Sequence, residues 1–208
     1  MLKFTILIPL LNLLPFIIGP NCLLNSKNMK GKLFGLYLSL NAAIGIICFI
    51  YALFGKNNHC FYNFFQIAVF LILIFIFNVD NKSRIFLISS LFVAAILVGN
   101  TFLLGIDKFN QLNFNIIFIV VGIISGIRIK QLIIDSNEFN FKDFEFWMLG
   151  GFFVFSFGLI FPNCFFSVES HKKSYFLFVF YYGYQVFINL IVNLLFLKSV
   201  SLFKKYEH

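Results

Sequence analysis

The stretch SYFLFVFYYGYQVFINLIVNLLFLK, residues 174–198, decides the fold class of this chain. It contains no acidic residue, and its single lysine, Lys198, stands at its end. An α-helix rises about 1.5 Å per residue, so about 20 apolar residues cross the hydrocarbon core of a bilayer. The stretch therefore predicts a transmembrane helix.

A series of polar residues runs through this predicted helix at four-residue spacing, and it consists of Tyr181, Gln185, Asn189 and Asn193. Residues four apart lie on the same side of a helix. Because hydrocarbon offers these groups no hydrogen-bond partner, we expect the series to face other helices or water. It then either forms interhelical hydrogen bonds that stabilise a bundle, or provides a ligand or gating position.

A further candidate lies in another apolar run, 112–134, where Arg128 stands about two turns inside the C-terminal end. Its long side chain either extends to the cytoplasmic interface beside Lys130, or holds a cation against an anionic headgroup or substrate. The candidate ligand-binding residues are therefore Tyr181, Tyr182, Gln185, Asn189, Asn193 and Arg128.

Six more apolar runs precede the one at 174–198. The chain of 208 residues is 61% hydrophobic and 12% charged, about half the charged share of a soluble domain. We therefore predict an all-α protein, an integral membrane bundle of seven transmembrane helices that form a single domain over residues 1–208. The predicted spans are 2–19, 33–55, 61–78, 85–104, 112–134, 146–166 and 174–198.

The distribution of basic residues predicts an orientation. Seven spans place the two termini on opposite sides, and eleven of the sixteen Lys and Arg residues fall on the side of the C-terminus. The positive-inside rule then favours an outside N-terminus and a cytoplasmic C-terminus in a cell membrane, with a bacterial inner membrane as the expected location. The net charge of +8 forms no dense basic patch, so we expect the lipid bilayer as a partner and no nucleic acid.

The predicted spans offer little material for catalysis, because their cores lack Asp, Glu, Lys and His. Intramembrane hydrolysis needs an activated nucleophile, a metal or a pair of carboxylates. The four cysteines form no CxxC pair, so we predict no metal site, no cofactor and no catalytic residue. Whether Cys22, Cys60 or Cys164 pair in a disulfide stays open.

Two pairs of small residues predict close helix packing. Gly122 and Gly126 lie four residues apart in one span, and Ala95 and Gly99 do so in another. Small side chains at this spacing let two membrane helices approach closely.

The segment Glu145-Phe146-Trp147 opens a Gly- and Phe-rich span, which is followed by the Tyr- and Asn-containing last span. Over about 60 residues this resembles bacterial seven-helix proteins that look like detached sensor membrane modules of histidine-kinase systems. The resemblance implies no catalytic residues, and it implies that a signal would pass through a membrane or cytoplasmic protein partner. We therefore expect a non-enzymatic sensor or partner-binding membrane subunit. The alternatives are a facilitator of a neutral or apolar small solute, and a lipid-handling intramembrane enzyme of the lysoplasmalogenase kind.

Overall fold

The computed structural model is built from α-helices. It describes residues 19, 26–54, 59–81, 83–106, 108, 110–135, 143–165 and 175–207, and these residues form no strand. The helices are α2 (Met29–Leu53), α3 (His59–Asn81), α4 (Arg84–Leu104), α5 (Gln111–Asp135), α6 (Phe144–Phe165) and α8 (Tyr175–Glu207). The predicted all-α fold class is therefore confirmed. The predicted first span, 2–19, lies outside the described residues apart from Gly19.

Five of the helices are long and apolar enough to cross a membrane. The membrane-spanning segments are Met29–Tyr51, His59–Val79, Arg84–Leu104, Gln111–Ile134 and Val179–Phe203, and a shorter apolar segment covers Phe144–Ile160 of α6. The chain is thus a multi-pass membrane protein by the length and composition of its described helices.

Capping groups, and not hydropathy, set several helix ends. Asn28 accepts a hydrogen bond from the backbone N–H of Lys30 at 2.9 Å, so α2 begins four residues before the predicted span. Ser83 accepts from the N–H of Phe86 at 3.3 Å and caps α4. The C-terminal end of α8 also differs from the prediction, because this helix continues to Glu207, beyond the predicted end at 198.

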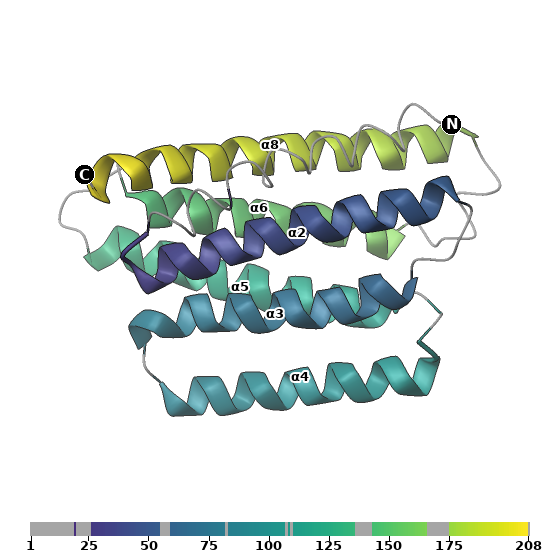
Figure 1. Cartoon of the computed structure of the whole chain (residues 1–208), viewed down its shortest axis with the longest axis horizontal. Coiled ribbons are helices and arrows are strands. Elements are labelled where there is room, and N and C mark those ends of the chain that lie inside the picture. The colour runs from purple at the N-terminus through teal and green to yellow at the C-terminus, as the bar shows by residue number, and fades with distance from the viewer. Residues whose placement is uncertain are drawn as a thin grey trace. The chain divides into compact units, whose positions relative to one another are not determined.

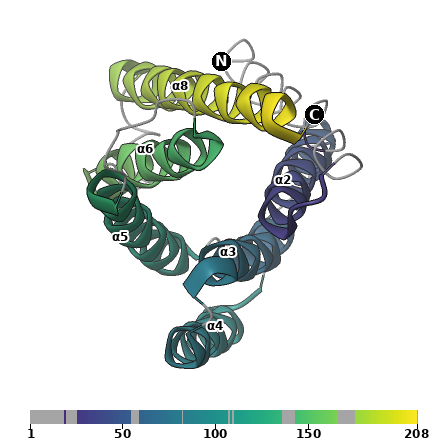
Figure 2. The ribbon, with the colours of Figure 1, turned by 90° about the vertical axis from the view of Figure 1, so that its left-hand side faces the viewer.

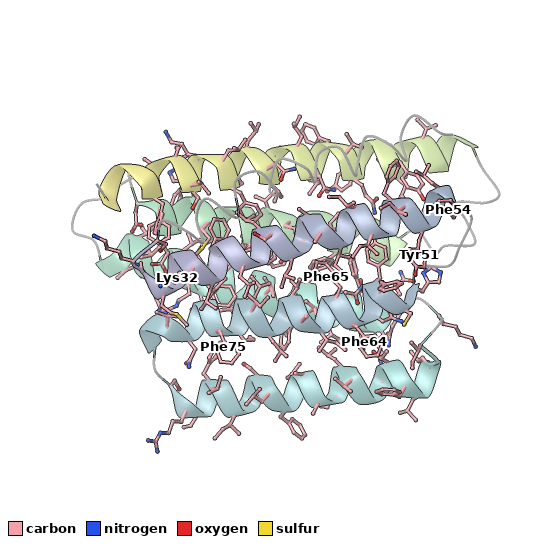
Figure 3. All side chains as sticks on the ribbon, viewed as in Figure 1. Lys32, Tyr51, Phe54, Phe64, Phe65 and Phe75 are labelled. Carbon is pink, nitrogen blue, oxygen red and sulfur yellow. The ribbon has the colours of Figure 1, made fainter. Side chains whose placement is uncertain are left out.

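The described residues divide into two compact units, one that ends at Ile117 and one that runs from Phe118 onward. In the first unit α3 packs against α2 and α4 (Figures 1 and 2). Lys32 marks one end of α2, and Tyr51 and Phe54 mark the other (Figure 3). There the ring of Tyr51 meets the ring of Phe61 on α3, with centroids 4.9 Å apart, which joins the end of α2 to the start of α3.

In the second unit α6 packs against α8 through glycines of α6 (Figure 1). A Cβ atom at Gly158 would meet Ile188 Cγ2 at 2.8 Å, and one at Gly151 would overlap the ring of Phe196. The backbone of α6 therefore lies directly against side chains of α8. Side chains larger than hydrogen at these two positions would push the helices apart.

The two predicted small-residue pairs have different outcomes. A Cβ atom at Gly122 of α5 would meet Phe157 Cε2 of α6 at 2.8 Å, and one at Gly126 would meet Phe153 Cε2 at 3.1 Å. Close packing at this pair is confirmed. On α4, in contrast, Ala95 is exposed, and a Cβ atom at Gly99 would meet nothing within 4 Å among the described residues.

Candidate functional site

The predicted polar series of α8 lies away from that helix's exposed side. Tyr181, Gln185 and Asn189 are half-buried and Asn193 is buried, with 6% of its surface exposed. The exposed side of α8 carries the apolar residues Phe180, Phe187, Leu190 and Leu194. The series therefore has the orientation expected for polar groups in a membrane helix.

Part of the hydrogen bonding of this series stays within α8. The Asn189 side-chain amide donates to the backbone carbonyl of Gln185 at 2.8 Å. The rings of Tyr181 and Tyr182 meet edge to face with centroids 5.4 Å apart. These neighbouring contacts fix the side chains of the candidate residues on α8.

Arg128 is separate from the α8 series in its bonding. Its Nη1 atom donates to the Oε1 atom of Gln131, one turn later on α5, at 3.1 Å. Gln131 is exposed, so the guanidinium group extends along the outside of α5 toward that helix's C-terminal end. The interfacial interpretation of Arg128 requires such an orientation along the helix, and it stays a prediction.

The largest buried polar group in the first unit is one that the sequence did not single out. We call it the asparagine cluster, and it consists of Asn63 on α3, Asn100 and Thr101 on α4, Asn110 in the α4–α5 connection, and Asn113 on α5. Four of these side chains are almost completely buried, with 1% exposed for Asn63, Thr101 and Asn113 and 2% for Asn110.

Asn63 holds the connection between α4 and α5. Its Nδ2 atom donates to the backbone carbonyls of Ile106 at 3.0 Å and Lys108 at 2.8 Å, and its Oδ1 atom accepts from the N–H of Asn110 at 3.2 Å. The connection starts at Gly105, whose φ of 93° is a backbone conformation that favours glycine. One side chain of α3 thus satisfies three backbone groups of a turn more than 40 residues away in sequence.

Asn110 and Asn113 extend this network into α4. Asn110 caps α5, because its Oδ1 atom accepts from the N–H of Asn113 at 3.0 Å. The Asn113 Nδ2 atom donates to the Leu97 carbonyl at 2.8 Å and to Thr101 Oγ1 at 2.9 Å, while its Oδ1 atom accepts from Asn100 Nδ2 at 2.7 Å. The start of α5 is therefore joined to α4 by side-chain hydrogen bonds.

Some polar atoms in the cluster and next to it make no hydrogen bond. The Nδ2 atom of Asn110 and both side-chain amide atoms of Gln66, one turn after Asn63 on α3, are buried without a hydrogen-bond partner among the described residues. Buried polar atoms without partners are rare in proteins, because each costs about 1–3 kcal/mol of desolvation. These three atoms make this end of α3 the strongest candidate for ligand binding in the first unit.

The chemistry available to the cluster is that of neutral amides and one hydroxyl. Such groups donate and accept hydrogen bonds but do not exchange protons near neutral pH. Among the described residues, no three His, Cys, Asp or Glu side chains come together to hold a metal ion. Cys60 is a free thiol, and the side chains of Cys22, Cys48 and Cys164 lie outside the described residues.

Local sequence signals could have identified one part of the cluster. Asn110 directly precedes an apolar run, which is the position of a helix N-cap. The bonds of Asn63 have no local signal, because their partners lie 43 to 47 residues away. Asn100 likewise joins the cluster through a partner 13 residues later, Asn113 on α5.

Comparison of the chain with protein-family models, curated proteins and solved structures finds no match. The function is therefore argued from the geometry of the helices alone.

Proposed function

We propose that the protein is a non-enzymatic membrane subunit that takes part in sensing by binding another membrane protein through α4. The observation that carries this proposal is the exposed pair Ala95 and Gly99. The same four-residue pattern on α5, Gly122 and Gly126, is covered by phenylalanines of α6. The small-residue surface of α5 thus packs against a helix, whereas the similar surface of α4 has no neighbour among the described residues.

The residues around this pair suit a transmembrane partner. Phe92, Ile96 and Leu103 are 67%, 50% and 87% exposed and flank the two small residues on α4. A partner helix could approach the backbone of α4 at Ala95 and Gly99 and pack between these larger side chains. The resemblance to sensor modules of histidine-kinase systems supports the same proposal, because their signal passes to a partner.

The test is purification in a mild detergent followed by mass spectrometry of co-purifying proteins. Gly99→Leu adds bulk where no described atom lies within 4 Å, so the variant should fold. Leu104→Phe, at an exposed position five residues from Gly99 and therefore on a different side of α4, is the matched control. We expect a stoichiometric membrane protein with the natural chain and the control, and its loss with Gly99→Leu. No co-purifying protein, or equal recovery from all three, would contradict the proposal.

A second candidate function is a facilitator for a neutral small solute, supported by the position of the α8 series away from the exposed side of its helix. The variant with Gln185, Asn189 and Asn193 all replaced by Leu tests it in proteoliposomes. Stopped-flow swelling with glycerol and urea should show flux for the natural chain and lose it in the variant. Equal rates in empty liposomes and in liposomes with the natural chain would remove this function for these solutes.

We further propose seven spans in total, with residues 2–19 as the first, an outside N-terminus and a cytoplasmic C-terminus. The bias of basic residues toward the C-terminal side supports this orientation. A fluorescent protein that matures only in the cytoplasm, fused after residue 208, should fluoresce. A dark fusion that is present in the membrane at normal level would reverse the orientation.

A further inference from the structure

On α3, beside the asparagine cluster, one buried side chain has a polar group that makes no hydrogen bond among the described residues. Gln66 is 7% exposed, and neither its Nε2 nor its Oε1 atom has a hydrogen-bond partner among the described residues. Residues 63, 66 and 70 follow helical spacing, and all three are buried. Gln66 therefore lies on the same side of α3 as Asn63, one turn from the bonds that Asn63 makes with the α4–α5 connection.

A second unused group belongs to Asn110, one of the residues that Asn63 binds. The Nδ2 atom of Asn110 has no partner among the described residues, while the same side chain's Oδ1 atom accepts from the N–H of Asn113. Asn63 Oδ1 accepts from the Asn110 backbone N–H at 3.2 Å, so Asn110 is held directly beside α3. Two donor groups and one acceptor are thus available on Gln66 and Asn110.

We propose that Gln66 and Asn110 bind a small uncharged molecule that carries an amide group. A primary carboxamide both donates and accepts hydrogen bonds, and it can pair with another carboxamide through N–H···O contacts in both directions. The Gln66 amide offers such a pair, and Asn110 Nδ2 offers one more donor to a carbonyl oxygen.

The molecule is expected to be uncharged because the side chains of the asparagine cluster and Gln66 are neutral. The side chains that form the cluster are amides and a hydroxyl, and a buried ion would need a compensating charge. Lys108 is adjacent in sequence but its side chain is exposed, and the cluster binds only its backbone carbonyl. Hydrogen bonds to a neutral amide would use these unpartnered atoms without this cost.

A comparison of two substitutions on α3 tests whether Gln66 is kept for binding and not for stability. Asn63→Leu should lower the thermal unfolding temperature, because three hydrogen bonds to the α4–α5 connection are lost. Gln66→Leu should leave that temperature unchanged or raise it, because an unsatisfied buried amide is replaced by an apolar side chain of similar size. A decrease with Gln66→Leu as large as that with Asn63→Leu would overturn the proposal.

Binding is measured on the full chain in detergent, with its four glutamines labelled with ¹⁵N and acetamide as the probe. We expect saturable shifts of one side-chain NH₂ pair, absent from Gln66→Leu, while the pair of Gln185 stays unchanged. N,N-dimethylacetamide, which accepts but cannot donate, should bind at least about tenfold more weakly, because a bond worth about 1.4 kcal/mol is lost.

Three outcomes would overturn the proposal. The first is that acetamide causes no saturable shift, and the second is that the shift persists in Gln66→Leu. The third is that the NH₂ pair of Gln66 exchanges magnetisation with water and does not respond to acetamide. The last outcome would assign the site to water. Because Gln66 and Asn110 are not on α4, the result does not depend on whether α4 binds a partner.

Discussion

The contact between α6 and α8 allows a sharp test, because two adjacent glycines of α6 differ only in what they face. A Cβ atom at Gly150 would meet nothing within 4 Å among the described residues. A Cβ atom at Gly151 would overlap Phe196 Cε1 and lie 2.6 Å from Cδ1 and 3.2 Å from Cζ of the same ring. We predict that Gly150→Ala is tolerated and that Gly151→Ala destabilises the second unit.

The magnitude follows from two opposing terms. Replacing Gly by Ala inside a helix favours the helix by about 1 kcal/mol at either position. Overpacking at position 151 adds a cost of about 1–3 kcal/mol, because the ring has to move. Phe196 is 4% exposed and lies edge to face on the buried ring of Phe152, with centroids 5.3 Å apart, so it has little room to move. The two variants should therefore differ by about 1–3 kcal/mol, or about five- to 140-fold in the folding equilibrium.

The assay is reversible unfolding in mixed micelles as the fraction of denaturing detergent is raised, followed by circular dichroism. The same pair of glycine substitutions is then measured with Phe196→Leu, which removes the ring atoms that a Cβ atom at position 151 would meet. We expect the difference between the two alanine variants to shrink toward zero in this background. If Gly151→Ala and Gly150→Ala unfold alike in the natural background, or if the difference survives Phe196→Leu, the packing argument is wrong.

Three further outcomes are expected in the same unfolding assay. Asn113→Ala should lower the free energy of unfolding by about 2 kcal/mol, because three side-chain hydrogen bonds worth about 0.6 kcal/mol each in a membrane are lost. Asn115→Ala is its control, because the Oδ1 atom of Asn115 has no partner among the described residues. An equal cost for the two variants would contradict the network. Gly122→Leu should cost at least about 1 kcal/mol by overlap with Phe157, whereas Gly99→Leu should not change stability. Ser199→Ala should cost about 1 kcal/mol through loss of the 2.8 Å bond to the Phe144 carbonyl, and no measurable loss would show that this bond does not stabilise the contact of α8 with α6.

The sequence alone determined the all-helical, multi-pass membrane character of the chain, and it located the helices α2 to α6 and α8 to within a few residues except at the end of α8. The physical reason is that a bilayer requires long apolar helices with internally bonded backbones, so hydropathy over about 20 residues is decisive. The outward apolar side of α8 followed in the same way from the spacing of Gln185 and Asn189.

Only the tertiary structure decided which of the polar and small residues come together. Asn63 and Asn110 are adjacent because α3 and the α4–α5 connection meet at one end of their unit, and no local pattern encodes a pair 47 residues apart. Likewise, the patterns at Gly122 and Gly99 look alike in sequence, but of the two only Gly122 has a helix packed against it among the described residues. Hydropathy measures the affinity of a segment for lipid, which is the same on every side of an apolar helix, whereas contacts between helices depend on the shapes of the two surfaces that meet.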